Sequence, residues 1–469
     1  MLFVEFSFLP FFLLVFCVHW ALRSHLARKL WLLLASYCFY AAWDWRFLGL
    51  ILASTLIDYG VGRRLHAGSH KRFWLGLSLC ANLGLLGFFK YYNFFMESGI
   101  ELIQLLGFEA HPSTLRIILP VGISFYTFQT LSYSIDVYRG KLQASDRLAD
   151  FALFVAFFPQ LVAGPIIRAI DFMPQLKVKT IFRRSDLRAA LVLFTVGFIK
   201  KACVSDGIAQ IPDEYFGDPA AYNALAAWIG TLFYAVQIYC DFSGYTDMAI
   251  ACAALLGYEL CVNFRFPYLA ADITDFWRRW HISLSSWLRD YLYIPLGGNR
   301  GSSLFQARNL ILTMLLGGLW HGAGWNFLLW GGLHGAALML HKLWSQALPE
   351  SSLPRRVTGF LGPLLTFGFV CLCWIFFRAT DFDSARSAAM AFLGLGASGL
   401  PGLESVQPAW AFGLLAGLAL AHWVASRHWT EAFWRALPRW GFTLALALLW
   451  ALALPFVPLE SKPFIYFQF

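Results

Sequence analysis

Charged residues are scarce in this chain, and that scarcity excludes an ordinary soluble protein. Only 13% of its 469 residues are Asp, Glu, Lys or Arg, whereas 59% are hydrophobic and the mean hydropathy is +0.60. Soluble domains carry roughly a quarter charged residues, so the composition predicts a polytopic membrane protein. The net charge of +9 comes from basic residues that follow apolar runs, a pattern typical of cytoplasmic loops. No nucleic-acid partner is therefore expected.

Paired cysteines and a cleavable leader are also lacking. The nine cysteines are scattered through the apolar runs without metal-finger spacing, so we expect neither a disulfide framework nor a zinc site. Residues 1–22 carry no basic start and no small-residue cleavage site, so we interpret them as a retained first span. Arg23, Arg28 and Lys29 follow directly, which predicts an external N-terminus.

Long apolar runs are what the chain has in abundance. A helical span needs about 20 apolar residues, and shorter interrupted pieces are tolerated at membrane depth where protein covers them. We therefore predict an all-α polytopic integral membrane protein with about ten to twelve transmembrane or re-entrant helices. The candidate spans or half-spans lie near residues 6–22, 30–43, 46–59, 73–94, 115–134, 149–170, 189–205, 222–241, 247–262, 308–341, 358–377, 409–425 and 441–458.

His321 is the most informative residue, because it lies inside the apolar run from Ile311 to Leu340. A charged side chain at such a depth costs roughly 2.5 kcal/mol or more, but histidine is substantially neutral near pH 7 and can act as a general base. The alternative is a histidine that only fills a helix interface. On a straight helix, His334 would face away from His321, and residues 307–348 contain no acid. We therefore expect no bound metal.

The segment 275–291 carries a second candidate, His281. Trp280, Leu284, Trp287 and Tyr291 recur at helical spacing, which predicts one amphipathic helix at the cytoplasmic interface. His281 is there either a structural or a functional residue.

Asp241 and Asp247 flank Ser-Gly-Tyr at the end of another apolar run. Buried acids are normally paired. We therefore expect these carboxylates to pair with arginines such as Arg278, Arg279 or Arg289, or to line a polar cavity.

Taken together, six segments resemble the membrane-bound O-acyltransferase family, in particular its bacterial polysaccharide-acetylation branch. They are L-P-V-G-I-S-F-Y-T-F-Q (119–129), I-D-V-Y-R-G (135–140), F-P-Q-L-V-A-G-P-I (158–166), D-F-S-G-Y-T-D-M-A-I (241–250), D-F-W-R-R-W-H-I-S-L-S-S-W-L-R-D-Y-L-Y-I-P-L-G-G-N-R (275–300) and G-G-L-W-H-G (317–322). The tail F-I-Y-F-Q-F (464–469) also fits.

The resemblance implies one membrane domain over residues 1–469, with its core motifs in 115–345 and further helices in 357–469. It implies a ring of tilted helices around a central channel, with the acyl thioester entering from the cytoplasm and the acceptor from the other side. It identifies His321 and His281 as the catalytic residues. The residues expected to contact substrate or shape its entrance are Trp320, Asn326, Asp241, Arg278, Arg279, Trp280 and Tyr245.

By the same resemblance we expect an O-acetyltransferase of the bacterial inner membrane that uses acetyl-CoA as donor and holds no permanent cofactor. The acetyl group would go to an exported polysaccharide, cellulose or alginate, through a periplasmic SGNH-like partner and a polysaccharide synthesis and export complex. Two alternatives stay open at this point. One is a permease with His321 as a proton relay, and the other is an acyltransferase that acts directly on a protein or lipid.

Overall fold

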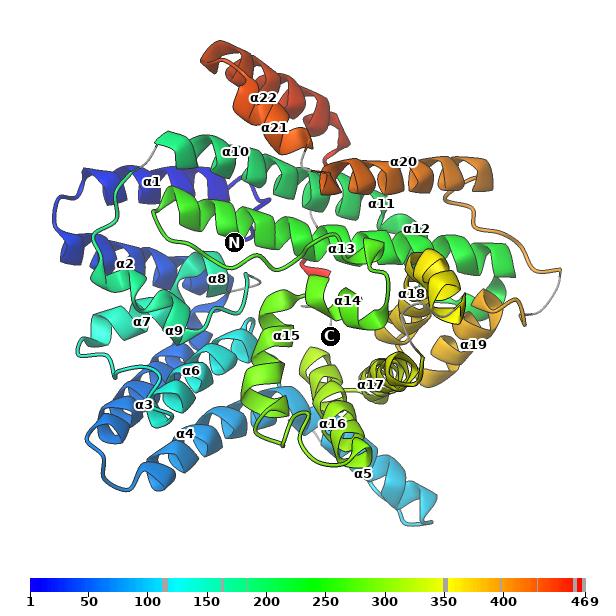
Figure 1. Ribbon diagram of the computed structural model, residues 1–469, viewed down its shortest axis with the longest axis horizontal. Coiled ribbons are helices and arrows are strands. Elements are labelled where there is room, and N and C mark those ends of the chain that lie inside the picture. Colours follow the sequence, from blue (N-terminus) through cyan, green and yellow to red (C-terminus); the bar gives the residue numbers. More distant parts are fainter. Residues whose placement is uncertain are drawn as a thin grey trace. The chain divides into compact units, whose positions relative to one another are not determined.

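The computed structural model describes residues 1–111, 117–161, 164–182, 184–348, 353–396, 399–427, 429–458 and 462–465. Every regular element in these ranges is helical, which confirms the predicted all-α class. Figure 1 follows the helices along the chain. The chain divides into two compact units, each with its own internal packing. The prediction of a single domain over residues 1–469 stays a prediction.

Within the described part of the chain, five helices are long and apolar enough to cross a membrane. They are Lys71–Leu105, Ala224–Leu255, Phe360–Arg378, Pro408–Ser426 and Arg439–Phe456. The other predicted spans are shorter or more polar helices, which fits the prediction that some pieces do not cross fully. Few residues of Pro408–Ser426 and Arg439–Phe456 are buried. Long apolar helices that expose their side chains are typical of contact with lipid.

Three of the predicted span boundaries are wrong. Residues 222–241 and 247–262 were expected to be two pieces, but α13 (Ala224–Leu255) runs through both, because Ser243 and Gly244 do not interrupt its hydrogen bonding. Residues 149–170 form three short helices rather than one span. The run 308–341 is two helices, because the backbone is extended at Gly322 and Gly324.

The first unit comprises residues 1–191 and 248–261. Its helices are α1 (Phe8–Ala21), α2 (His25–Asp44), α3 (Leu48–His66), α4 (Lys71–Leu86), α5 (Tyr92–Leu105), α6 (Ile123–Tyr138), α7 (Leu148–Ala156), α8 (Phe158–Leu161) and α9 (Ala169–Phe172). Helices α3, α4 and α6 pack together around the buried carboxylate of Asp58. Ser78, Asn82 and Ser134 donate hydrogen bonds to Asp58, so this buried carboxylate is held by neutral donors from two other helices.

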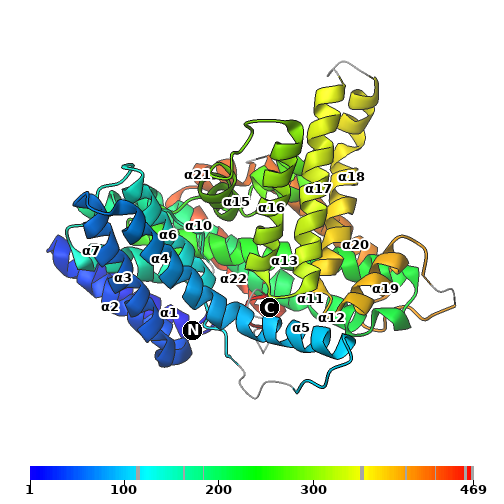
Figure 2. The ribbon, with the colours of Figure 1, turned by 90° about the horizontal axis from the view of Figure 1, so that it is seen from below.

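The second unit comprises residues 192–247 and 262–469. Besides most of α13 it contains α11 (Asp206–Ile208), α12 (Gln210–Gly217), α14 (Ile273–Arg279), α15 (Ile282–Leu288), α16 (Ser303–His321), α17 (Trp325–Ala347), α18 (Leu353–Arg378), α19 (Phe382–Phe392), α20 (Pro408–Ser426), α21 (Trp429–Ala436) and α22 (Arg439–Ala453). Helix α10 (Arg184–Phe198) lies across the division. Within this unit α16, α17 and α18 lie side by side (Figure 2).

Glycines allow α16 and α17 to approach backbone to backbone. A Cβ on Gly318 would collide with the carbonyl oxygen of Phe327, and one on Gly331 with the carbonyl oxygen of Met314. Small residues permit such close packing of membrane helices. The contact sets the position of His321, the last residue of α16.

Two connecting segments and the cysteines complete the description. Residues 394–396 and 399–407 form a loop that leads to the start of α20 at Pro408. Helix α18 begins at Leu353, and residues 349–352 lie outside the described residues. All nine cysteines are free, and four of them, Cys17, Cys38, Cys80 and Cys261, are exposed.

Candidate active site

His321 lies at the C-terminal end of α16 and is buried. The helix ends there because the next residue, Gly322, adopts extended backbone geometry. The ring of Phe327 occupies the place where a Cβ of Gly322 would be. The Trp-His-Gly sequence therefore places the histidine at a sharp bend, with the following helix packed directly against it.

Aromatic side chains surround the imidazole of His321. Its ring centroid lies 5.0 Å from Trp320, 5.0 Å from Trp330 and 5.3 Å from Phe377. These contacts come from α16, α17 and α18. Two tryptophans and a phenylalanine from a more distant part of the sequence therefore surround the imidazole.

His281 lies at the junction between α14 and α15, with φ at +43°. The prediction of one amphipathic helix over 275–291 is wrong at this point, because a left-handed residue interrupts the helix. The apolar stripe itself is confirmed, since Trp280, Leu284 and Trp287 are buried. A left-handed conformation is uncommon for residues other than glycine and persists where surrounding contacts hold it.

Asn263 supplies those contacts. Its side-chain oxygen lies 3.1 Å from Nδ1 of His281, and it accepts hydrogen bonds from the backbone N–H of Ser283 at 3.1 Å and the Ser283 hydroxyl at 2.9 Å. Its backbone carbonyl accepts a further bond from the N–H of Ile282 at 2.9 Å. One asparagine therefore holds both the side chain of His281 and the backbone that follows it.

The structure brings the two predicted catalytic histidines together. Their ring centroids are 6.3 Å apart, although the residues are 40 positions apart in the sequence. His281 also contacts Phe242 at 4.6 Å and Trp320 at 5.9 Å. Burial lowers the pKa of His281 from 6.5 to about 3, so this imidazole stays neutral at physiological pH. Two imidazoles and the aromatic rings around them form a buried enclosure, in which electrostatic interactions are stronger than in water.

Three other predicted substrate residues are buried close to this enclosure. Trp280 packs against Trp374 at 4.9 Å, and Tyr245 packs against Phe464 at 5.3 Å. Asn326 donates from Nδ2 to the carbonyl of Ala379 at 3.1 Å. This bond links the start of α17 to the end of α18. The roles of all three residues in substrate binding stay predictions.

The ion-pair partner of Asp241 differs from the one expected. Its carboxylate pairs with Lys201 at 2.6 Å rather than with an arginine, and it accepts a bond from the backbone N–H of Ile465 at 2.8 Å. Asp247 likewise pairs with Lys200 at 2.7 Å. The predicted arginine partners are wrong, because the π-helical turn Ile199–Ser205 brings both lysines to α13.

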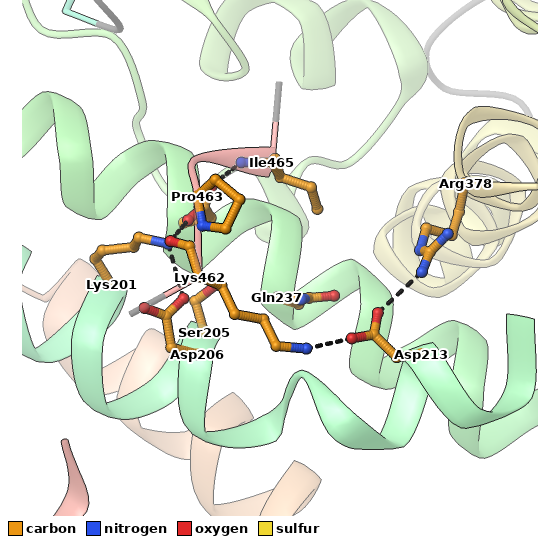
Figure 3. Close-up of a pocket in the computed structure, with 10 residues that line it drawn as sticks. Lys201, Ser205, Asp206, Asp213, Gln237, Arg378, Lys462, Pro463 and Ile465 are labelled. Carbon is orange, nitrogen blue, oxygen red and sulfur yellow. Dashed lines mark hydrogen bonds and ion pairs between the residues drawn. The ribbon is translucent and has the colours of Figure 1, made fainter. Parts of the chain in front are cut away.

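The alternative prediction for Asp241, that it lines a polar cavity, is confirmed. A cavity of about 220 Å³ is lined by ten residues, and Asp241 is one of them. Lys201 and Asp206 lie at one end and Asp213 and Arg378 at the other (Figure 3). Lys462 joins the two ends, because its backbone carbonyl accepts from Lys201 and its ammonium pairs with Asp213. Arg378 contacts Asp213 at 2.9 Å. Within the sequence, Asp241 and Arg378 directly adjoin Phe242 and Phe377, the residues that contact His281 and His321.

The two predicted arginines lie on the surface of the short helix α14. Arg279 pairs with Asp275 at 2.8 Å, and Arg278 is exposed. Their expected role at the entrance for the donor stays a prediction.

His334 is separated from His321 by an indole. The ring of Trp330 lies 5.0 Å from His321 and 4.7 Å from His334. The straight-helix argument used for this pair does not apply, because the chain bends between α16 and α17.

Sequence reasoning missed two residues of this region. Lys201 lay within a run that was interpreted as a span, and a lysine in such a run is itself a signal for a functional or paired charge. Asn263 gave no comparable signal, because its contact with His281 depends on the path of the loop between α13 and α14.

Comparisons with known proteins show which family the chain belongs to. The model of the membrane-bound O-acyltransferase family matches residues 145–380, which include both histidines. A probable alginate O-acetylase of Azotobacter vinelandii is 44% identical over 410 residues, covering 86% of this chain and 79% of that protein. A peptidoglycan O-acetyltransferase of Helicobacter pylori is 40% identical over 422 residues, covering 83% and 78%. A teichoic acid D-alanyltransferase of Streptococcus thermophilus is 28% identical over 320 residues, covering 61% and 75%.

A helical membrane protein with a buried histidine pair is thus the class that the fold and the site define. The chain belongs to the membrane-bound O-acyltransferase family, and the predicted family and enzyme class are confirmed. Its relatives are multi-pass membrane enzymes of acyl transfer, so the permease alternative has no support.

Proposed function

We propose that this protein transfers an acetyl group from cytoplasmic acetyl-CoA to a hydroxyl acceptor on the other face of the bacterial inner membrane. The acetyl group is destined for an exported polysaccharide. The observation that carries the proposal is the pairing of His281 and His321 in one buried aromatic enclosure, in a chain of an acyltransferase family.

In the proposed step, neutral His321 takes the proton of the acceptor hydroxyl. The hydroxyl oxygen attacks the carbonyl carbon of the thioester, a C–O bond forms and the C–S bond breaks. The imidazolium then returns the proton to the thiolate, which leaves as free coenzyme A. General-base catalysis of this kind contributes roughly 10²–10⁴-fold to the rate. No cofactor or metal enters the step.

A periplasmic partner of the SGNH hydrolase-like type is the proposed direct acceptor, and it passes the acetyl group to the polymer within a synthesis and export complex. The sequence predicted cellulose or alginate as the polymer. The relatives described as alginate O-acetylases favour alginate, and the Helicobacter pylori relative adds peptidoglycan to the candidates. Acylation of a protein or lipid as the final product has no comparable support.

The test is a single turnover with labelled acetyl-CoA and purified protein in lipid nanodiscs, with the SGNH-like partner added. We expect release of free thiol and transfer of the label, and a decrease of about 10²–10⁴-fold in the His321→Ala variant.

The matched control is His19→Ala, which removes another buried imidazole and should retain the wild-type rate. Undiminished transfer in His321→Ala would remove the proposed base. A wild-type protein that leaves the thioester intact would overturn the proposed function itself.

A further inference from the structure

The hydrogen bonds around Asn263 determine which nitrogen of His281 carries a proton. The backbone N–H of Ser283 has no acceptor capacity, so the atom that faces it at 3.1 Å must be the Asn263 oxygen. The same oxygen lies 3.1 Å from Nδ1 of His281. Nδ1 must therefore be the N–H donor, and the neutral ring carries its lone pair on Nε2.

Nε2 of His281 is buried and has no hydrogen-bond partner among the described residues. Buried polar atoms are normally satisfied, and one that is not calls for an explanation such as a role in binding or catalysis. The His281 ring lies among other rings, with centroid distances of 5.9 Å to Trp320 and 6.3 Å to His321. A ligand in this enclosure would meet a hydrogen-bond acceptor at a fixed position.

The chemistry of the two substrates indicates which group it accepts. The single proton of the acceptor hydroxyl goes to His321 in the proposed reaction. The pantetheine arm of acetyl-CoA, however, carries amide N–H groups a few bonds from the thioester, and these need an acceptor when they leave water. Because His281 stays neutral, it serves as an acceptor rather than as a proton carrier.

Resting on the proposed function, we propose that Asn263 is a positioning residue that holds His281 in the Nδ1–H tautomer, so that Nε2 binds an amide N–H of the thioester donor's pantetheine arm. Asn263 also holds the backbone after the left-handed residue through Ile282. The donor is thereby located with its thioester beside His321.

The first test compares Asn263→Leu with Ser283→Ala in the full chain. Asn263→Leu removes the partner of Nδ1, and we expect the KM for S-acetyl-pantetheine to rise about tenfold while kcat falls less than threefold. Ser283→Ala removes one donor to the same oxygen, together with a hydroxyl that lies 3.5 Å from Nδ1 of His281. It keeps the bond between Asn263 and His281, so its KM should stay close to that of the wild type. Equal effects of the two variants, or a loss confined to kcat, would overturn the proposal.

The second test replaces the donor's amide nearest the sulfur by an ester, which removes the N–H. Wild-type kcat/KM should fall about tenfold with this analogue, whereas Asn263→Leu should process both donors equally. A wild-type protein that does not distinguish them would refute the role of Nε2 and leave acetyl transfer intact.

The third test uses Asn263→Asp, which keeps the shape of the side chain but adds a charge. A carboxylate beside Nδ1 favours the imidazolium, which turns Nε2 into an N–H donor. The KM should therefore rise as the pH falls through the new pKa and recover at higher pH, in a variant that is monodisperse in detergent. A KM that does not change with pH would contradict the proposal.

Discussion

At the scale of single residues, the buried imidazole of His281 shows how an apolar environment keeps a histidine neutral. The side chain of His281 is buried beside Phe242 and Trp320. Burial disfavours the charged form, which is why its pKa is lowered. The benefit is an acceptor nitrogen that does not titrate in the physiological range.

This buried histidine makes stability depend on pH. In the unfolded chain a histidine titrates near 6.5, whereas in the folded chain His281 titrates at about 3. Between these values only the unfolded state gains the proton, so stability falls as the pH decreases below 6.5, by up to about 1.4 kcal/mol per pH unit. The thermal midpoint in detergent should decrease between pH 7 and pH 4, and less steeply in His281→Gln.

Other buried histidines add to the slope of the wild type and of the variant alike, so the difference between the two isolates His281. An identical slope in both proteins would mean that this ring is protonated in the folded state.

At the scale of helices, the bend between α16 and α17 is the feature that places His321. The two helices are in backbone contact at Gly318 and Gly331, and the ring of Phe327 lies against Gly322. At Gly318 and Gly331 the neighbouring atoms belong to the backbone, which cannot move aside as a flexible side chain can. Even one added methyl group must therefore displace a helix.

Two adjacent glycines provide a matched test of this contact. Gly331→Ala places a methyl group against the carbonyl of Met314, whereas in Gly332→Ala the nearest atom is Cδ2 of Leu315 at an ordinary 3.6 Å. Overpacking costs typically about 1–3 kcal/mol. We expect Gly331→Ala to lower the thermal midpoint by several degrees and to reduce acetyl transfer, and Gly332→Ala to leave both unchanged. Equal midpoints for the two variants would contradict the close approach.

At the scale of the whole molecule, the distribution of Lys and Arg along the chain predicts how the protein is oriented in the membrane. Within the second unit, the segment that precedes α13 carries Asp213 and Glu214 in α12 and Asp218 after it, and it has no Lys or Arg between residues 202 and 223. The segment after α13 carries Arg278, Arg289 and further basic residues. Lys and Arg remain on the cytoplasmic side, so α13 should cross the membrane once between an external and a cytoplasmic loop.

Cysteine labelling tests this orientation. In a background without the exposed native cysteines, Asp218→Cys should react with a membrane-impermeant maleimide in intact spheroplasts, whereas Arg300→Cys should react only after permeabilisation. Both positions are exposed. Reaction of Arg300→Cys in intact spheroplasts would reverse the orientation and place the α14–α15 segment on the side opposite to the donor.

The sequence by itself determined the class of this protein, because apolar runs, basic loops and the sequence motifs around His281 and His321 are local patterns. It also identified both histidines and the tryptophan beside His321. Its errors came where one pattern admits several conformations. The stripe in 275–291 does not reveal a left-handed residue at His281, and an interrupted apolar run does not reveal that α13 is continuous.

Only the tertiary structure decided which residues meet. Asn263 with His281, Lys201 with Asp241, and Phe377 with His321 are separated by 18, 40 and 56 positions. Periodicity and propensity describe a residue's relation to its near neighbours along the chain, whereas these contacts depend on how loops and π-helical turns direct whole helices. Local motifs therefore identify the chemical groups of the site, whereas the packing between helices determines where these groups lie.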